Sequence, residues 1–449
     1  MKNIFFIGIA TCLYFSSQAQ KIFDSASYIA FYETKWERIN FDTSAKTRVP
    51  LNENERIAGL SKCWSEAKYN FANFDLIPTL NWDSLYLAFI PKVKKAKNNN
   101  DYYKVLQNFY SHLHDGHSSV TSPEIFSYNA AFPIDVRWIE NKAIVTKVKS
   151  AGADWKDVKP GDELIVFQNQ PIKDYVSTNV SPFLSYSTPQ DSIERMYRYE
   201  LFFGREGSAS QMTFKDEKGK ETSKVFTREK VASLWNPEKL LEYRVLPGNI
   251  GYLQLLSFNS NKIVAQFDSL FPQIEKTKAL IIDLRDNGGG NGNNGFEIIG
   301  NLSDKPFYTG KQAIRYYRPV GRSWGSVEKI DITGDDWKPY KNKLYDKPVA
   351  LLIGGATYSA AEDFISAFKS INRGKIFGTP SGGSTGQPVM FNLPGGGFGR
   401  VCAKRDFAVN GVEFVGIGFQ PDILVNQTIK STRAGKDDVL EAAIRSFNF

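Results

Sequence analysis

Apolar residues recur at intervals of three and four between residues 28 and 117, and this spacing predicts helices. The stretch Asn52–Glu55 is typical of a helix start and precedes apolar positions 57, 60, 63, 64 and 67. Trp82–Ser84 predicts the start of a second helix, and Asp101 predicts the cap of a third that runs to Leu113. We therefore expect an N-terminal helical domain over residues 20–125.

Short strand patterns replace the helical spacing beyond residue 126. Ala143–Val148 is typical of a strand, and Val158–Phe167 is typical of a turn followed by a strand. The turn at Gly161-Asp162 and the strand after it resemble those of PDZ domains, which bind extended peptides and chain ends by strand addition. Residues 177–203 are expected to be helical, so the domain is longer than a minimal PDZ domain. The sequence thus predicts a PDZ-like, β-rich domain over residues 126–235.

From Asn249 onward, continuous apolar strands alternate with helices. Strands are predicted at 250–255, 279–284 and 349–353, and helices at 262–275, 359–370 and 437–446. Strands that are apolar throughout are buried on both faces, which favours a mixed sheet covered by helices. The expected fold class is α/β in a multidomain chain, with this third domain spanning residues 236–449.

The N-terminus has the pattern of a secretory signal. Lys2 supplies a positive charge, Ile4–Phe15 is almost wholly apolar, and Ser16–Ala19 ends in small residues that a signal peptidase reads. We expect cleavage after Ala19 and export to the periplasm or the extracellular space. Cys12 as a lipoprotein cysteine is an alternative, but it lies early in the apolar run and follows a threonine. No later segment has 18 uninterrupted apolar residues, so stable membrane insertion is not expected.

The composition indicates a globular protein and argues against some classes of function. The chain is 42% hydrophobic and 23% charged, as in globular proteins. Its net charge of +8 is spread along the sequence without an Arg-rich stripe, which argues against nucleic-acid binding. Removal of the signal leaves Cys63 and Cys402, which form neither a disulfide framework nor a zinc spacing. They are expected to be buried, and a single bridge between them stays open.

Two segments could carry chemistry. Ile282–Gly290 is a buried strand that ends in three glycines, where backbone N–H groups can converge on one point. A flexible loop is the alternative for such a glycine run. In Gly354–Phe364 a strand turns into a helix with Ser359 at the turn, which would expose its hydroxyl beside the helix N-terminus. A simple N-cap is the alternative for this serine.

Together the two segments resemble the C-terminal-processing (tail-specific) proteases and the tricorn core protease. Those families carry an IDLRxNGGG segment and then a SAxE helix start, and both occur here in that order. The resemblance extends to the N-terminal helices, the PDZ-like region and the terminal segment Gly418–Ile423. It implies a catalytic domain of the ClpP/crotonase type with Ser359 as nucleophile. It also implies oxyanion N–H groups from Ala360 and from Gly288 or Gly289, with no cofactor.

One departure concerns the general base. In the lysine-using branch a lysine follows the nucleophile by 25 residues, but that position is Ser384 here, and no lysine lies between Lys375 and Lys404. A serine hydroxyl is too weak a base to replace an amine. The three histidines of the chain lie at positions 112, 114 and 117. In the tricorn-like branch the base is the histidine that ends an LxDGH segment, and residues 113–117 have this pattern. The resemblance thus implies His117, whose unperturbed pKa of about 6.5 suits proton transfer.

A third group should orient this imidazole. The resemblance implies a glutamate shortly before the GxxPD segment, which makes Glu413 the candidate. Some relatives have their glutamate at the position of Val415, on the same strand face. Asp115 and Glu362 are the alternatives for this role.

The sequence therefore predicts an exported serine endopeptidase that cleaves extended or unfolded polypeptides through an acyl-enzyme, with Ser–His catalysis and substrates recognised at their C-terminus. An inactive peptide- or lipid-binding protein on the same scaffold is the alternative. His112-Leu113-His114-Asp115-Gly116-His117 superficially resembles the zinc motif of metallo-β-lactamase-like hydrolases. However, its aspartate is one position early and no distant histidines exist, so no metal is expected. The sequence does not indicate an oligomeric state.

Overall fold

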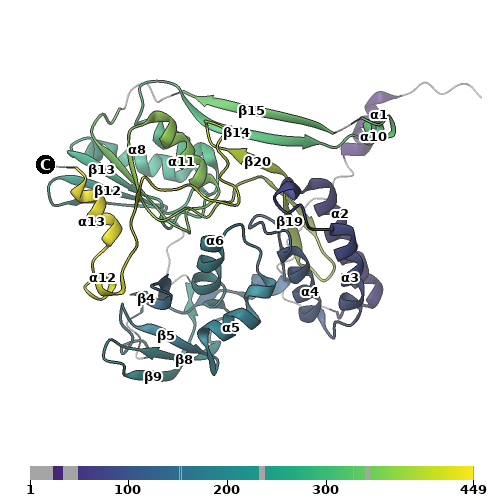
Figure 1. Ribbon diagram of the computed structural model, residues 1–449, viewed down its shortest axis with the longest axis horizontal. Coiled ribbons are helices and arrows are strands. Elements are labelled where there is room, and N and C mark those ends of the chain that lie inside the picture. Colours follow the sequence, from purple (N-terminus) through teal and green to yellow (C-terminus); the bar gives the residue numbers. More distant parts are fainter. Residues whose placement is uncertain are drawn as a thin grey trace, which may run out of the picture. The chain divides into compact units, whose positions relative to one another are not determined.

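The computed structural model describes residues 24–33, 49–150, 152, 154–231, 238–326, 328–338 and 344–447. The predicted signal peptide, residues 1–19, lies outside these ranges. The chain divides into two compact units, residues 1–39 and residues 40–449. The first contains helix α1 (Ser25–Glu33), and the second contains the other described helices and strands (Figure 1).

The three predicted N-terminal helices are present: α2 (Glu53–Asn70), α3 (Trp82–Lys94) and α4 (Asn99–Ser111). Asn52 caps α2 as expected, because its side chain accepts the Glu55 N–H and Glu55 accepts the Asn52 N–H. The third helix begins earlier than predicted, because the Asn98 side chain caps it by accepting the Asp101 N–H.

The core of these helices also takes in residues from the far end of the chain. Phe391, Leu393, Val401 and Cys402 are buried among them. These four residues lie on or beside strands β18 (Pro388–Asn392) and β19 (Phe398–Cys402). The N-terminal helices therefore form one core with a C-terminal hairpin.

The middle region contains an antiparallel sheet in the order β3-β4-β5-β8-β9. Its strands are β3 (Ile134–Ile139), β4 (Lys142–Val148), β5 (Glu163–Phe167), β8 (Ala209–Lys215) and β9 (Glu221–Thr227), with β6 (Gln170–Pro171) paired to β5. A smaller sheet joins β10 (Glu229–Lys230), β2 (Ala130–Ala131) and β7 (Phe203–Gly204). The PDZ-like character of this region and the three domain boundaries stay predictions.

The helical stretch predicted over residues 177–203 is wrong as a continuous helix. It consists of the end of α5 (Ile172–Asn179), η3 (Ser181–Phe183), α6 (Pro189–Glu194) and η4 (Arg195–Tyr199). Pro182 and Pro189 each stand at the first turn of a new element, where proline is tolerated because its missing N–H is not needed.

The C-terminal region contains the predicted mixed sheet, in the order β11-β12-β13-β16-β17-β21. Its strands are β11 (Leu241–Leu246), β12 (Ile250–Leu255), β13 (Ala279–Asp283), β16 (Val349–Ile353), β17 (Gly374–Gly378) and β21 (Ile423–Leu424), of which β11 is antiparallel to its neighbour and the others pair in parallel.

Helices cover both faces of this sheet, as expected. Leu280 and Ile282 share a core with α8 (Lys262–Ile274), α9 (Gly292–Ile299) and α11 (Ala360–Ile371). The alternate residues Ala279 and Ile281 pack with α13 (Asp438–Arg445), which follows α12 (Ile429–Arg433). Because both faces are buried, the central strands β13 and β16 consist almost wholly of apolar residues.

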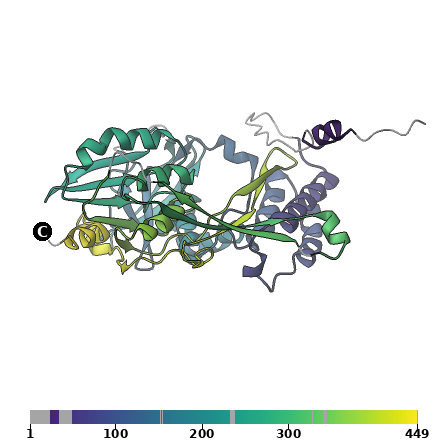
Figure 2. The same cartoon turned by 90° about the horizontal axis from the view of Figure 1, so that it is seen from above.

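A long hairpin that the sequence analysis did not predict extends from this domain. It consists of β14 (Phe307–Tyr316) and β15 (Lys329–Trp337), with α10 (Pro319–Ser323) near its tip, and β14 also pairs with β20 (Lys404–Phe407). Figures 1 and 2 show it running from the C-terminal sheet to the N-terminal helices. Arg315 on the hairpin donates to the Phe71 carbonyl at 2.8 Å, so the contact is fixed by a hydrogen bond.

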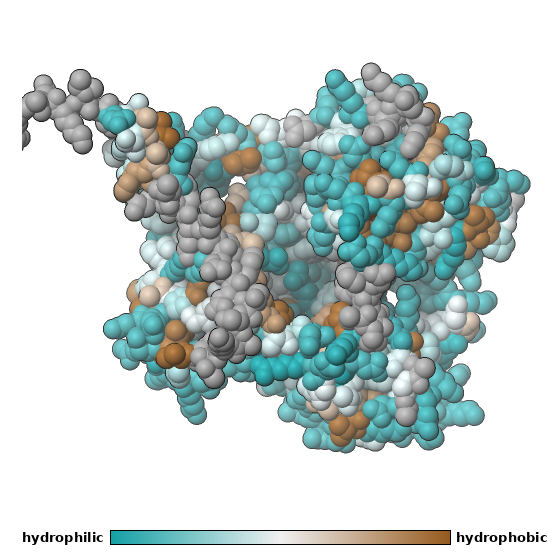
Figure 3. Space-filling model, turned by 180° about the vertical axis from the view of Figure 1, so that it is seen from behind, coloured by the Kyte–Doolittle hydropathy of each residue, from teal (hydrophilic) through white to brown (hydrophobic). Residues whose placement is uncertain are grey.

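On the face seen in Figure 3, hydrophobic residues form small separate groups among hydrophilic ones. Within the described ranges, no helix combines the length and the apolar character needed to cross a membrane.

Candidate active site

Ser359 occupies the sharp turn between β16 and α11. Its backbone has φ 57° and ψ −127°, and a positive φ of this kind costs a non-glycine residue about 1–3 kcal/mol. Main-chain hydrogen bonds fix the turn on both sides. The Tyr358 N–H donates to the Asn287 carbonyl and the Ser359 N–H donates to the Ser384 carbonyl, each over 3.0 Å. The predicted strand-to-helix turn is therefore present, with the strain found at nucleophile elbows.

The structure brings His117 to this turn. Its Nε2 lies 3.0 Å from Ser359 Oγ, although the two residues are 242 positions apart in the sequence. Strand β1 (Ser119–Thr121), which follows His117 closely, pairs antiparallel with β19, and Ser119 lies opposite Arg400. The strand pairing therefore joins the early segment of the chain to the C-terminal hairpin of β18 and β19.

Contacts in the structure explain why residues 115–117 are Asp, Gly and His. Asp115 accepts the backbone N–H of His117 at 2.9 Å. The His117 ring stacks on the Tyr358 ring, with centroids 4.9 Å apart and planes inclined by 9°. A Cβ on Gly116 would lie 2.1 Å from the Tyr358 hydroxyl. Glycine is thus required at 116 for the tyrosine to lie against the imidazole.

The environment of His117 keeps its imidazole neutral. The residue is buried, with 5% of its surface exposed. Burial lowers the pKa of His117 well below its ordinary value, and the nearby charges of Arg400 and Arg195 lower it further. A neutral ring has one nitrogen free to accept a proton, as a general base requires.

The second ring nitrogen contacts a residue that differs from the predicted one. His117 Nδ1 lies 2.7 Å from Ser384 Oγ. The structure does not bring Glu413 to the ring, because its carboxylate accepts two hydrogen bonds from Arg405, at 2.7 and 3.1 Å. The orienting contact assigned to Glu413 is therefore wrong, and Val415, a buried apolar residue, offers no substitute.

The two alternatives for this role lie nearby but bind other groups. Asp115 binds the main chain of His117, as described above. Glu362, in the first turn of α11, is fully buried and accepts hydrogen bonds from Ser381 Oγ, the Gly383 N–H and the Ser384 N–H at 2.6, 2.8 and 2.8 Å. Burial raises the pKa of Glu362 to about 8, while these donors oppose the rise. The carboxyl group thus anchors the segment that carries Ser384.

The glycine turn lies directly against the serine. Gly289 has φ +96°, and a Cβ there would lie 2.7 Å from Ser359 Cβ, so the approach requires glycine. Its N–H donates to Asn287 Oδ1 at 2.9 Å, which corrects the prediction that it is available to an oxyanion. Gly288 is exposed. The N–H of Ala360 belongs to the first helical residue, where no intrahelical acceptor exists.

The remaining histidines and the cysteines lie apart from this chemistry. His112 Nδ1 contacts the Asn108 carbonyl at 2.7 Å, and the His114 ring packs edge-on against Tyr186. Across the described ranges, no three His, Cys, Asp or Glu side chains are arranged to hold a metal ion. Cys63 and Cys402 are buried free thiols, so the bridge left open by the sequence is not formed.

Comparison with known protein families gives a match over most of the C-terminal region. Residues 249–425 match the model of peptidase family S41. The chain carries a peptidase family S41 domain. The site described above belongs largely to this domain, whereas His117 comes from outside the matched residues.

Two curated proteins with sequences similar to this chain are named as C-terminal-processing peptidases. The chain is 29% identical over 208 residues to the carboxy-terminal-processing protease of Bartonella bacilliformis, which is 45% of this chain and 44% of that protein. It is 28% identical over 231 residues to the chloroplastic carboxyl-terminal-processing peptidase 2 of Arabidopsis thaliana, covering 50% and 41%. The match thus spans less than half of each relative.

Solved structures show that the fold extends beyond the S41 domain. Mature CPAF complexed with lactacystin superposes with a TM-score of 0.71 at 14% identity, covering 88% of this chain and 98% of that chain. The photosystem II D1 C-terminal processing protease gives 0.51 at 18% identity, covering 83% and 93%. At these identities the likeness shows the fold alone.

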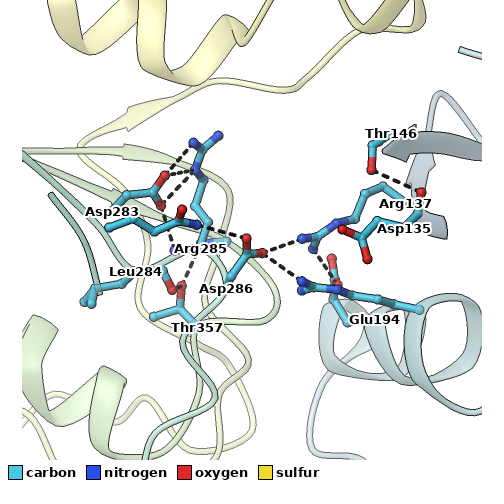
Figure 4. Close-up of polar contacts among 12 residues, drawn as sticks. Asp135, Arg137, Thr146, Glu194, Asp283, Leu284, Arg285, Asp286 and Thr357 are labelled. Atoms are coloured by element: carbon cyan, nitrogen blue, oxygen red, sulfur yellow. Dashed lines mark hydrogen bonds and ion pairs between the residues drawn. The ribbon is translucent and has the colours of Figure 1, made fainter. Parts of the chain in front are cut away.

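An ion-pair network joins the S41 domain to the middle region. Asp286 precedes Asn287 and the glycine turn, and its carboxylate accepts hydrogen bonds from Arg137 on β3 and Arg198 on η4 (Figure 4). Gln254 donates to its other oxygen at 3.1 Å. Burial acts to raise the pKa of Asp286, but Arg198 and Arg137 outweigh it and hold that pKa well below its usual range. The base of the glycine turn is therefore held by residues outside the S41 domain.

Replacing Asp286 with alanine is expected to destabilise the protein by about 3 kcal/mol, because two largely buried guanidinium groups lose a carboxylate partner. Urea unfolding at neutral pH measures the change. Asp304→Ala, at an exposed aspartate, is the matched control and should unfold like the wild type. Equal unfolding midpoints for both variants would show that the network does not stabilise the fold.

Proposed function

We propose that this protein is a serine endopeptidase in which Ser359 is the nucleophile and His117 is the general base. The observation that carries the proposal is the 3.0 Å contact between His117 Nε2 and Ser359 Oγ. A neutral imidazole within hydrogen-bond reach of a serine hydroxyl on a strained turn is the arrangement that activates a serine.

The chemistry follows from these positions. As Ser359 Oγ attacks a peptide carbonyl carbon, His117 Nε2 takes the hydroxyl proton, and the carbonyl oxygen becomes an oxyanion. The Ala360 N–H, at the positive end of α11, and the Gly288 N–H are the proposed donors to that oxyanion. The imidazolium then gives its proton to the leaving amine. Water then attacks the acyl-enzyme carbonyl while His117 Nε2 takes its proton, and the imidazolium returns that proton to Ser359 Oγ as the ester C–O bond breaks and the acid product leaves.

The proposed substrates are extended or unfolded polypeptides, cleaved near their C-terminus and encountered after export. The names of the curated relatives support C-terminal processing. The middle sheet has β9 at its edge, paired with β8 alone among the described strands, and a free edge can accept a peptide by strand addition. The pattern of residues 1–19 supports export.

A fluorophosphonate serine probe tests the proposal. The purified protein should form one covalent adduct, located on the Ser359 peptide by mass spectrometry, and should degrade reduced casein. A peptide with a free C-terminal carboxylate should be cleaved faster than its amidated form. Absence of both labelling and cleavage, together with tight peptide binding, would instead support the inactive binding protein.

A further inference from the structure

The His117 ring lies between two serine hydroxyls. Nε2 faces Ser359 Oγ at 3.0 Å and Nδ1 faces Ser384 Oγ at 2.7 Å. Ser384 is completely buried. It stands 25 positions after Ser359, where the lysine-using proteases that this chain resembles have their base.

The proposed base function fixes which nitrogen carries the proton. Nε2 can accept the Ser359 proton only while it has none of its own, and a neutral imidazole has one N–H. That N–H must therefore be on Nδ1, where it donates to Ser384 Oγ. If the hydroxyl donated to Nδ1 instead, the ring would carry its proton on Nε2 and could not act as the base.

The backbone holds Ser384 in a fixed position relative to the nucleophile. The Ser359 N–H donates to the Ser384 carbonyl over 3.0 Å, so the two serines are joined directly. The Ser384 N–H donates to Glu362 Oε2 at 2.8 Å, and the Gly383 N–H donates to Oε1. Two residues before Ser384, the Gly382 carbonyl accepts a hydrogen bond from Thr188 Oγ1 at 2.8 Å. The hydroxyl is therefore preorganised by groups that do not themselves contact the ring.

We propose that Ser384 is a positioning residue that holds His117 in the Nδ1–H tautomer and aims its Nε2 at Ser359. This role rests on the proposed function of the same site. In the peptidase template an aspartate does this work, and its loss leaves the imidazole in the wrong tautomer. Here the buried hydroxyl replaces the carboxylate. Tyr358 restricts the ring from its face, whereas Ser384 acts in the ring plane.

Kinetics of Ser384→Ala test the proposal, with Ser366→Ala as the control. Ser366 is a buried serine on α11 whose hydroxyl has no partner in the described part of the chain. Ser384→Ala should lower kcat by about 10²-fold with KM nearly unchanged, less than the loss caused by removing a triad aspartate. Ser366→Ala should keep wild-type kcat. A wild-type kcat in Ser384→Ala would overturn the positioning role.

A spectroscopic measurement decides the question even if Ser384→Ala folds poorly. The chain has three histidines, so ¹⁵N-histidine labelling gives three ring systems, which His112→Gln helps to assign. Wild-type His117 should show a protonated Nδ1 and a bare Nε2. A protonated Nε2 in the wild type would overturn the proposal without any variant at Ser384.

The two hypotheses fail in different ways. If Ser384→Ala is as active as the wild type while Ser359→Ala is inactive, the positioning role is wrong and the peptidase function stands. If wild-type protein neither cleaves casein nor reacts with the probe, the proposed function itself is wrong.

Discussion

Ser359→Ala is expected to lower kcat/KM for an unfolded polypeptide by about 10⁴-fold or more, since it removes the atom that forms the acyl-enzyme. The substitution keeps Cβ and therefore the packing against Gly289. The thermal midpoint should stay close to that of the wild type. Initial rates of casein hydrolysis, measured at substrate concentrations well below KM, give the ratio directly.

The same variant supplies its own control for substrate binding. It should bind a fluorescent peptide with wild-type affinity, because the contacts with substrate outside the scissile bond are unchanged. Residual hydrolysis at more than a hundredth of the wild-type rate, with the fluorophosphonate adduct found on another serine, would contradict Ser359 as the nucleophile.

The sequence predicted the C-terminal sheet well because each of its elements has its own apolar pattern within a short segment of the chain. Residues 279–282 and 349–353 are apolar throughout, and the helices between the strands have apolar residues at helical spacing. Each pattern follows from burial of that element alone. The hairpin β14–β15 was missed because its strands are mostly solvated, so burial imposes no continuous apolar run on them.

Of the active-site residues, the sequence predicted those that belong to recognisable motifs. Ser359 and His117 follow from short segments with specific residues, and the structure brings them together. The Ser384 contact depends on how β1 pairs with β19 and on where Glu362 anchors residues 381–384, and no local pattern encodes either. A signal for Ser384 existed in its spacing from Ser359. A hydroxyl at that position is too weak a base to replace an amine, but it is a good hydrogen-bond acceptor.

Glu413 shows the opposite error. The sequence has a glutamate near the expected position, but the strand expected there is absent, since Glu413 forms only an isolated β-bridge with Phe407. In the folded chain Arg405 neutralises it, at a site where 41% of the side chain is exposed. A carboxylate at the surface can pair with a cation and keep its hydration, whereas burying it beside the imidazole without a cationic partner would cost free energy.

His117→Ala is expected to lower kcat by about 10³–10⁴-fold, because Ser359 loses the group that takes its proton. The pH profile gives an independent signature. In the wild type, kcat/KM should be constant through pH 6.5 and fall only at lower pH. Below its pKa the ring is protonated at both nitrogens and cannot act as a base. Burial, with Arg400 and Arg195, holds that pKa well below 6.5.

His112→Gln is the matched control for His117. His112 lies at the C-terminal end of α4, and its ring contacts the Asn108 carbonyl. Its removal should leave both kcat and the acid limb unchanged. The residual activity of His117→Ala should lose that limb, because no protonation of residue 117 then limits the rate. An acid limb that persists in His117→Ala with the same midpoint would assign the ionisation to another group and would remove the main support for Ser–His catalysis.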